Sequence, residues 1–284
     1  MQRLLGVQAV TLAKIMRTSL IVTTYNRKEA LRCCIESAFR QKVLPDEIVV
    51  ADDGSREDTA EAVRELASLS PIPLLHVWQP DEGFRAAASR NRGVAASTGD
   101  YIVFIDGDMV LHPLFIVDHL TIAKMGQWIQ GGRVLLSTKT TERVLVSDEF
   151  RLGFWSGGIA NRQNAVRSPL LASLFRQPWR VSPIKGVRSS NMSLWRKDIE
   201  QVNGFDESFV GWGNEDCEFV VRLANAGVVR RNLKFAAIAF HLYHPEHSRD
   251  SVGQNAAMLE DSIRCKRIRC EQGLDQHVTF LDIE

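Results

Sequence analysis

Two carboxylates, Asp106 and Asp108, flank one glycine directly after the apolar run 101–105. A run of β-branched and aromatic residues of this kind is typical of a strand that is buried on both faces. Two acids at one strand end repel each other unless a positive charge lies between them. A divalent cation such as Mg²⁺ or Mn²⁺ takes oxygen ligands and often shares them with phosphates. The pair therefore predicts a metal site, and an ordinary Asp-Gly turn is the alternative interpretation.

The elements around this pair follow a regular alternation. Strand patterns occur at 19–24, 47–53, 74–78 and 101–105, and helical patterns at 28–40, 56–69 and 85–96. Strands that alternate with amphipathic helices form right-handed crossovers and a mainly parallel sheet. In an open sheet of this kind, ligands bind beyond the carboxyl ends of the strands. The sequence therefore predicts an α/β fold with a mainly parallel central sheet flanked by helices.

Further polar side chains gather where the predicted strands end. Each of them taken alone is ordinary turn chemistry, but together they describe a crevice beside the acid pair. The chain has neither a GxGxxG nor a GxxxxGK[ST] motif, which argues against a Rossmann dinucleotide site and a P-loop. The candidate ligand-binding residues at these ends are Thr23, Tyr25, Asp52 and Asp53.

Composition narrows the classes of protein and partner. Of the 284 residues, 45% are hydrophobic and 24% are charged, as in a folded domain with a sizeable core. The formal net charge of +1 gives no reason to expect a nucleic acid as partner. The five cysteines include no CxxC pair and fit a reducing compartment, so we expect a cytoplasmic protein. No apolar run reaches the roughly 18–20 residues of a membrane helix.

The downstream half is less regular. We expect helices at 112–125 and 196–202 and strands at 128–136 and 234–240. Residues 151–183 combine arginine, glycine and aromatic residues and contain no acid. This segment has three interpretations: a packed connection with a solvated basic edge, a mobile flap, or a peripheral contact with anionic lipid headgroups.

A second cluster that could do chemistry lies at 212–216. Asn214 is a suitable N-cap for a helix whose first turn contains Glu215 and Asp216. Acids in a first turn often do no more than stabilise the helix through its dipole. If the turn faces a cleft, Asp216 could instead take a proton from a hydroxyl group. Trp212, between two glycines, would then offer an apolar face to a ligand ring.

Two histidines, His241 and His244, follow the last predicted strand. A lone histidine after a strand is more often structural than a metal ligand. Two of them three residues apart, directly after a buried strand, favour a metal-binding role.

At this point the motifs resemble a known family. The blocks IVTTYNRKEALRCCIES, EIVVADDGSREDT, DEGFRAAASRNRGV and YIVFIDGDMV are similar to the nucleotide-binding half of inverting family-2 glycosyltransferases with the GT-A fold. That resemblance implies that Thr23 and Tyr25 frame the nucleotide base and that Asp52 and Asp53 read the uracil and ribose. It further implies roles along the nucleotide or diphosphate for Arg85 and Arg90, and roles at the ribose and metal for Asp106 and Asp108.

The downstream blocks NMSLWRKD, GFDESF and GWGNED resemble the C-terminal motif of galactosyl- and N-acetylgalactosaminyltransferases and of bacterial chondroitin-type polymerases. In those families the acid after the glutamate is the catalytic base, which implies this role for Asp216. Trp212 and Glu215 would bind the acceptor. The third metal ligand of these families is usually a histidine, which implies His241, with His244 as the next candidate.

The resemblance implies a metal-dependent inverting transferase. It would use Mn²⁺ or Mg²⁺ to move a sugar from a UDP-sugar to a glycan or lipid-linked oligosaccharide in polysaccharide or lipopolysaccharide synthesis. The chain would divide into an extension (1–17), a nucleotide-sugar-binding half (18–136), an acceptor-binding half of the same domain (137–250) and a helical tail (251–284). The expected location is cytoplasmic, with peripheral contact at the inner face of the membrane as a further hypothesis. The oligomeric state is not predicted.

Two alternatives stay open at this level. Asp106-Gly107-Asp108-Met109-Val110 also matches the DxDx[TV] nucleophile motif of haloacid-dehalogenase-type phosphohydrolases. Such enzymes normally open their chain with this motif, whereas here three strand–helix units precede it. The second alternative is a nucleotide-sugar-binding protein that has lost catalysis.

Overall fold

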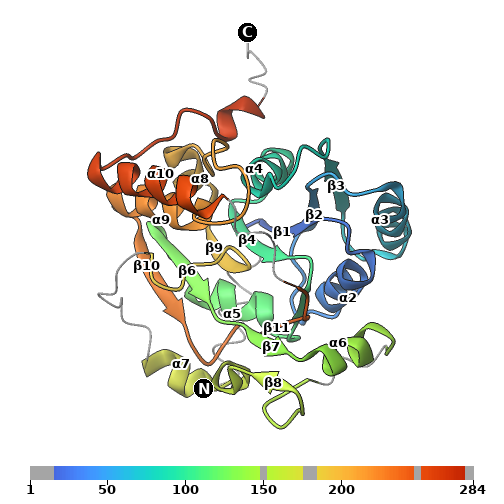
Figure 1. Ribbon diagram of the computed structural model, residues 1–284. Coiled ribbons are helices and arrows are strands. Elements are labelled where there is room, and N and C mark those ends of the chain that lie inside the picture. Colours follow the sequence, from blue (N-terminus) through green and yellow to red (C-terminus); the bar gives the residue numbers. More distant parts are fainter. Residues whose placement is uncertain (1–15, 148–151, 175–183, 246–250, 279–284) are drawn as a thin grey trace.

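The computed structural model describes residues 16–147, 152–174, 184–245 and 251–278 (Figure 1). The first strands and helices are β1 Thr18–Thr24, α2 Lys28–Phe39, β2 Glu47–Asp52, α3 Glu57–Leu69, β3 Leu74–Trp78, α4 Ala86–Ala96 and β4 Tyr101–Asp106. They match the alternation that the sequence predicts to within one residue at each end. The middle of the chain contains β5 Met109–Leu111, α5 Phe115–Ile122, β6 Gln127–Gly131, β7 Val134–Leu136, α6 Thr138–Leu145, β8 Ile159–Ala160, the 3₁₀ turn η1 Arg162–Ala165 and α7 Pro169–Leu174. The last part contains β9 Asn191–Trp195, α8 Arg196–Val202, α9 Glu215–Asn225, β10 Val229–Leu233, β11 Ala239–His241, α10 Val252–Arg264 and the 3₁₀ turn η2 Leu274–Gln276.

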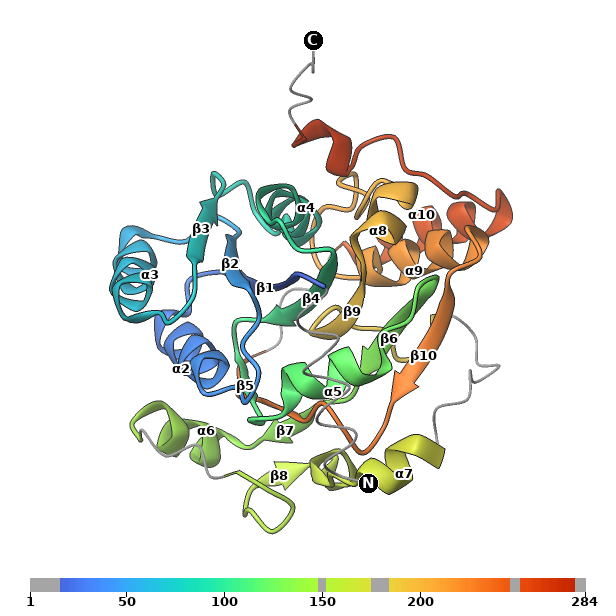
Figure 2. The ribbon, with the colours of Figure 1, turned by 180° about the vertical axis from the view of Figure 1, so that it is seen from behind.

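A seven-stranded sheet crosses the molecule in the order β10-β6-β9-β4-β1-β2-β3 (Figures 1 and 2). The strands β1, β2, β3 and β4 pair in parallel, as do β6 and β10, while β9 is antiparallel to both of its neighbours. The predicted mainly parallel sheet is therefore confirmed. From β1 the chain first adds β2 and β3 on one side and then crosses to β4 on the other. The carboxyl ends of β1 and β4 thus form a switch point, where open α/β sheets bind ligands.

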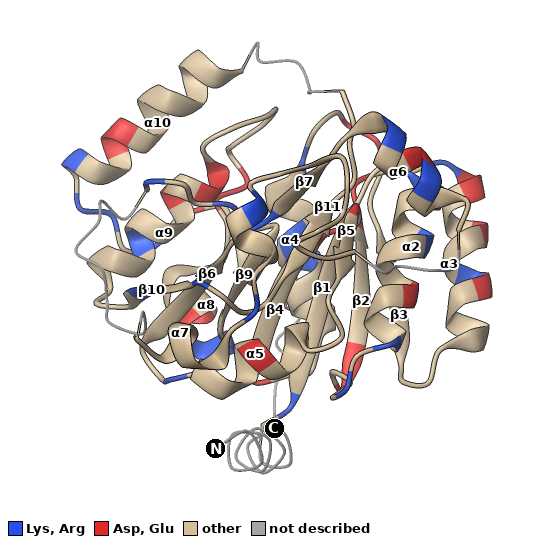
Figure 3. Ribbon diagram, turned by 90° about the horizontal axis from the view of Figure 1, so that it is seen from below, with Lys and Arg blue, Asp and Glu red and all other residues tan. Residues whose placement is uncertain are grey.

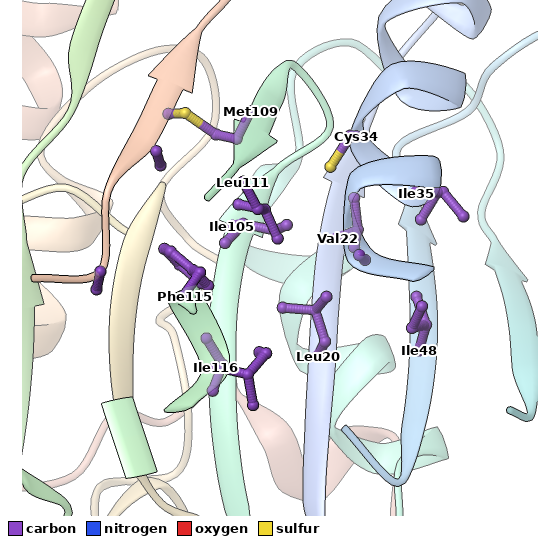
Figure 4. Packing of buried hydrophobic residues seen from close by; sticks show 14 of the residues in the cluster. Leu20, Val22, Cys34, Ile35, Ile48, Ile105, Met109, Leu111, Phe115 and Ile116 are labelled. Carbon is purple, nitrogen blue, oxygen red and sulfur yellow. The ribbon is translucent and has the colours of Figure 1, made fainter. Parts of the chain in front are cut away.

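Both faces of this sheet are covered, which explains why its strands read as continuous apolar runs. Successive side chains of a strand point to opposite faces. Leu20 and Val22 of β1 belong to a buried cluster with α2 and α5 (Figure 4). Ile21, between them, belongs to a second cluster with α4, α8 and α9. Helices on both sides therefore hold the strand ends in fixed positions around the switch point.

A second sheet of four short strands, in the order β5-β11-β7-β8, was not predicted. The single strand expected at 128–136 is in fact two, β6 in the large sheet and β7 in the small one. The chain breaks at a glycine pair because another side chain fills the space: a Cβ on Gly131 would lie 2.2 Å from Asn191 Oδ1. The sequence pattern was continuous, but the chain changes sheet within it.

Two further predicted elements are too long. The helix expected at 112–125 is confined to α5, because residues 109–111 form β5 and His112 N–H still donates to Ile238 O (3.0 Å). In place of the strand expected at 234–240, the structure has only the short strand β11, Ala239–His241. Phe235 and Ala237 have positive φ angles of 59° and 46°, which are incompatible with a strand.

The tail helix α10 lies against α9 at one side of the molecule (Figures 1 and 2). Within the described ranges, no helix is long and apolar enough to cross a membrane. Acidic and basic residues are interspersed along α3 (Figure 3), in keeping with the near-neutral net charge of the chain.

Candidate active site

A cavity of about 760 Å³ opens at the switch point between β1 and β4. Its walls come from both halves of the chain, and it brings together most of the residues that the sequence singled out. The predicted site residues that line it are Thr23, Tyr25, Asp53, Arg90, Asp106, Asp108, Trp212, Glu215, Asp216, His241 and His244.

Asp52 does not line the cavity. Its side chain is 1% exposed, accepts the backbone N–H of Ser55 (Oδ1, 2.8 Å) and lies 2.9 Å from His76 Nε2. It therefore holds the turn after β2. Of the predicted pair Asp52 and Asp53, only Asp53 reaches the crevice.

Arg85 does not line the cavity with its side chain either. Its guanidinium lies 3.8 Å from Glu82, while its backbone N–H donates to Asp53 Oδ2 (2.9 Å). Burial raises the pKa of Asp53 to about 6, against the opposing effect of the Arg85 N–H and of Gln79. Arg85 thus acts on the crevice through its main chain, by fixing the orientation of Asp53.

Tyr25 forms an aromatic edge of the cavity. It is 40% exposed, and its hydroxyl donates to Asp81 Oδ2 (2.9 Å). The same loop around Asp81 packs against Gly54, whose φ of +93° and lack of a side chain allow this close approach. The ring position is therefore set by the loop that follows β3 and by the turn after β2 against which that loop packs.

Three candidate metal ligands meet on the small sheet. Asp108, His241 and His244 offer ligand atoms that all lie within 4.8 Å of one another. Pairing of β5 with β11 places Met109 opposite His241, and Leu242 N–H donates to Asp108 O (2.9 Å). The short second sheet therefore joins an acid to two histidines more than a hundred residues downstream.

The donor atoms of this cluster fit a divalent cation. Asp108 Oδ2 lies 3.5 Å from His241 Nε2 and 3.4 Å from His244 Nε2. These donor atoms are close enough together that one cation could contact all three after small movements. Asp108 Oδ1 is buried without a hydrogen-bond partner. Burial lowers the pKa of His241 to about 4, so its imidazole is neutral and keeps a lone pair for a metal.

The guanidinium of Arg27 contacts the same cluster. Arg27 Nη1 lies 2.8 Å from Asp108 Oδ2, and Arg27 Nη2 donates to Tyr243 O (3.3 Å). No sequence motif singles out Arg27, which follows β1 in an ordinary polar turn. Its guanidinium contacts Asp108 Oδ2, which is the oxygen that lies next to both histidines and that a metal ion would bind.

Asp106 lies outside this three-residue cluster and faces Arg90. Its Oδ1 atom is 3.7 Å from Arg90 Nη2, and the same guanidinium lies 3.3 Å from Glu215 and 3.5 Å from Asp216. One guanidinium cannot neutralise three carboxylates, of which Glu215 is buried and the other two are partly buried. Burial raises the pKa of Asp106 and of Glu215 to about 7 in each case, with a neighbouring acid adding to the effect and Arg90 opposing it.

One carboxylate oxygen of Asp216 accepts a hydrogen bond, and the other accepts none but lies 3.5 Å from Arg90 Nη1. Its Oδ2 accepts the Ser189 N–H (2.9 Å), whereas Oδ1 is buried without a hydrogen-bond partner. Asn214 stands at the expected N-cap position of α9. However, it has a left-handed backbone (φ 71°) and its side chain makes no capping bond, so its predicted capping role is wrong. The strained turn instead presents the start of α9 to the cavity.

Arg133 and Arg188 are further cavity residues that the sequence analysis missed. Burial and the nearby charge of Arg188 lower the pKa of Arg133, while Asp106, Asp108 and Asp216 oppose this effect. Among the described residues neither arginine has an ion-pair partner within 4 Å. A signal for Arg133 was the double glycine before it, which marks the break between the two sheets.

The basic segment 151–183 is only partly described. Phe175, Arg176, Trp179 and Arg180 lie outside the described residues. Of the arginines that are described, Arg167 forms a two-bond ion pair with Asp118, and Arg162 donates to the carbonyls of Phe154 and Ser156. Both are therefore engaged within the fold.

Three features define the class of protein: the mainly parallel sheet with its switch point, the cluster of Asp108, His241 and His244, and the carboxylate of Asp216. The class is that of glycosyltransferases with the GT-A fold. The sequence profile described as Glycosyl transferase family 2 matches residues 19–173, more than half of the chain. The chain belongs to glycosyl transferase family 2. A second profile, described as N-terminal domain of galactosyltransferase, matches residues 172–245. The family predicted from the motifs is thereby confirmed, and it rules out the phosphohydrolase alternative.

Similar curated proteins include several synthases of polysaccharides. The chain is 30% identical to the chondroitin synthase of Escherichia coli over 244 residues, covering 80% of this chain and 35% of that protein. It is 28% identical to the hyaluronan synthase of Pasteurella multocida, covering 80% and 24%. A validoxylamine A glucosyltransferase of Streptomyces hygroscopicus subsp. limoneus is 28% identical, with 74% and 48% covered. The chain thus spans between a quarter and a half of the length of these relatives.

Solved structures share the fold. A mannosyltransferase of Pyrobaculum calidifontis, PcManGT, in complex with GDP-Man and Mn²⁺, superimposes with a TM-score of 0.56 at 17% identity, covering 93% of this chain and 76% of that one. S. aureus TarS 1-349 gives 0.60 at 15% identity, covering 93% and 69%. Likeness at this level of identity is evidence about the fold.

Proposed function

We propose that this chain transfers a sugar from a UDP-sugar to a hydroxyl group of a glycan or lipid-linked oligosaccharide, with inversion at the anomeric carbon and with a bound Mn²⁺ or Mg²⁺. One observation carries the proposal. A single cavity is lined both by the metal-capable cluster of Asp108, His241 and His244 and by the carboxylate of Asp216. That cavity lies where GT-A sheets bind nucleotides, beside Tyr25 and Asp53.

Asp216 is the proposed base. Ser189 N–H fixes one carboxylate oxygen, and the other, which accepts no hydrogen bond and lies 3.5 Å from Arg90 Nη1, would accept the hydroxyl proton. As that proton leaves, the acceptor oxygen bonds to the anomeric carbon, and the bond from this carbon to the diphosphate oxygen breaks with its electrons leaving on UDP. A single base on the face opposite the leaving group gives inversion. Trp212 and Glu215 would orient the acceptor sugar.

The metal proposal rests on Asp108, His241 and His244. A divalent ion held there would neutralise the diphosphate and stabilise UDP as leaving group. Two imidazoles beside one carboxylate favour Mn²⁺ over Mg²⁺, which prefers an all-oxygen set. Asp106 stays a proposed ribose or metal contact, next to Arg90 on the nucleotide side.

The experiment is a donor screen with calorimetry. The chain is incubated with Mn²⁺ and each common UDP-sugar, with GDP-mannose as comparison, and nucleotide release is measured. We expect release from one UDP-sugar above all others. Lack of release from every donor, with UDP still bound, would favour the non-catalytic alternative.

Metal dependence is tested separately. EDTA should weaken UDP binding by about tenfold or more, because an ion held by Asp108, His241 and His244 would offset the negative charge of the diphosphate. Asp108→Ala should bind UDP weakly with or without EDTA. Asp58→Ala serves as the matched control, because Asp58, at the start of α3, pairs with Lys28 and does not line the cavity. UDP affinity that is unchanged by EDTA and by Asp108→Ala would refute the metal assignment.

We propose, finally, a cytoplasmic location with peripheral contact at the inner face of the membrane. The support is apolar exposure: Trp155 is 90% exposed, and Leu170 and Leu174 of α7 are 58% and 67% exposed. Since Arg162 and Arg167 are engaged internally, we expect insertion of apolar side chains to dominate over charge. Trp155→Ser with Leu174→Ser should reduce sedimentation with anionic liposomes; unchanged sedimentation would remove the proposal.

A further inference from the structure

The tail helix α10 forms part of the cavity wall although it lies beyond both family matches. The match that reaches furthest along the chain ends at residue 245, whereas α10 begins at Val252. Val252 itself lines the cavity, together with Trp212 and Asp216. The sequence assigned no role to this tail, so its contacts with the cavity call for an explanation.

The turn that carries Trp212 has little structure of its own. Gly211, Gly213 and Asn214 have positive φ angles of 78°, 112° and 71°, so the chain around Trp212 follows neither a helix nor a strand. One backbone bond, from Gly211 N–H to Phe84 O (2.9 Å), ties it to the loop before α4. A turn of this kind needs partners from elsewhere if a large aromatic ring is to stay in place.

Asn255 of α10 supplies such partners. Its side chain is 1% exposed, and Nδ2 donates to Val210 O (3.3 Å) and to Gly213 O (2.9 Å). These two carbonyls lie immediately before and after the Gly211–Trp212 pair. One amide group therefore bridges both ends of the turn.

The packing beside Asn255 is equally close. A Cβ on Gly211 would lie 2.1 Å from Ser251 Oγ, and a Cβ on Gly213 would lie 3.6 Å from the Val252 side chain. The first turn of α10 thus lies directly on both glycines. The lack of a side chain on Gly211 is what allows the helix to approach the turn, whereas a Cβ on Gly213 would make an ordinary van der Waals contact.

We propose that α10 fixes the acceptor side of the active site and that Asn255 is a positioning residue for Trp212. The inference rests on the proposed function, in which Trp212 contacts the acceptor sugar. Asn255 does not touch substrate; it acts by holding the two carbonyls that bracket the Trp212 turn. A purely structural role for Asn255 would affect donor and acceptor kinetics together, whereas a positioning role affects the acceptor alone.

The test compares Asn255→Ala with Asn225→Ala. Asn225 is a matched control because its Nδ2 also joins a helix to a backbone carbonyl, that of Arg267 (2.8 Å), but away from the cavity. The acceptor probe is a chondroitin oligosaccharide, and hydrolysis of the UDP-sugar by water reports the donor side. For Asn255→Ala we expect KM for the oligosaccharide to rise about tenfold, as a displaced orienting group predicts. The Kd for UDP and the rate of hydrolysis should stay at wild-type values, and Asn225→Ala should behave as wild type throughout.

Hydrogen–deuterium exchange supplies a readout that needs no acceptor. Backbone amides of residues 209–214 should exchange faster in Asn255→Ala than in wild type or Asn225→Ala. Unchanged exchange in this turn would overturn the inference whether or not the chain transfers sugar. If exchange rises but the KM for the oligosaccharide does not, the positioning role is refuted.

Failure of the proposed function looks different. Wild-type chain that neither hydrolyses a donor nor transfers a sugar would refute the function, while exchange in residues 209–214 would still decide whether Asn255 holds the turn. If Asn255→Ala does not fold, Asn255→Ser provides the milder change. It should alter KM and exchange in the same direction by a smaller factor.

Discussion

The two sides of the active site are built in different ways. On the nucleotide side, Thr23, Tyr25, Asp53 and Asp106 each follow or end a parallel strand, within about eighty residues of one another. The acceptor side is assembled from distant pieces: the loop before β9, the turn before α9 and the start of α10. The first side inherits its geometry from the sheet, whereas the second depends on individual side chain–backbone bonds.

This difference has a consequence for how each side responds to mutation. Residues at strand ends are held by the buried faces of the whole sheet, so changes there should affect binding without moving the backbone. The acceptor side depends on single contacts, such as Ser189 N–H to Asp216, and should lose its arrangement when one contact is removed. Three predictions test this contrast.

The largest expected effect is that of Asp216→Asn. Removal of a general base typically costs 10²–10⁴-fold, and we expect the transfer rate to fall about 10³-fold. Because the nucleotide side is held by the sheet, the Kd for UDP should change less than about twofold. Transfer is measured with the best donor of the screen, and UDP binding by calorimetry. Near wild-type transfer would place the base elsewhere; a large change in UDP affinity would show that the two sides are not independent.

The predictability of each side from sequence follows the same division. Strand-end residues were identified because periodicity locates the strands, and parallel strands bring their carboxyl ends to one edge. Asp52 was misplaced because alternation of side chains at a strand end depends on where the strand stops. Arg133 was missed because the break between β6 and β7 looks like one continuous strand. The contact of Asn255 with the Trp212 turn spans about forty residues and has no pattern in the sequence.

The second prediction concerns Glu215, at the boundary between the two sides. Burial and Asp216 raise its pKa to about 7, with Arg90 opposing, so the folded chain holds a proton that the unfolded chain loses at lower pH. A raised pKa of an acid stabilises the fold fully below about pH 4.5, and this contribution is lost as pH rises through about 7. A pKa difference of 1 between the folded and unfolded chain corresponds to about 1.4 kcal/mol. The free energy of unfolding therefore falls by at most about 3 kcal/mol over this pH range.

Glu215→Gln should remove this part of the pH dependence. Urea unfolding at pH 5 and pH 8 in metal-free buffer should give a smaller fall in the free energy of unfolding for Glu215→Gln than for wild type. Some fall should persist, because burial also raises the pKa of Asp106. Glu61→Gln, exposed on α3, is the control and should match wild type. Equal falls for wild type and Glu215→Gln would mean that Glu215 ionises normally within the fold.

The smallest expected effect tests whether the metal cluster is preformed. Arg27 contacts Asp108 Oδ2 at 2.8 Å, so a metal ion must displace the guanidinium before it can share that oxygen with the histidines. Arg27→Met removes the competing cation and keeps an unbranched apolar side chain. Partly exposed ion pairs contribute about 1 kcal/mol or less, so Mn²⁺ affinity without nucleotide should rise by no more than about fivefold. The measurement is Mn²⁺ titration followed by electron paramagnetic resonance.

Arg32→Met is the matched control, because Arg32 of α2 pairs with Glu65 of α3 and neither residue lines the cavity. If its Mn²⁺ affinity equals that of wild type while that of Arg27→Met rises, Arg27 competes with the metal for Asp108. Weaker Mn²⁺ binding by Arg27→Met would instead mean that the guanidinium orients the carboxylate for the ion. In that case the metal cluster would depend on a single side-chain contact, as the acceptor side does, and the contrast between the two sides would be confined to the nucleotide pocket.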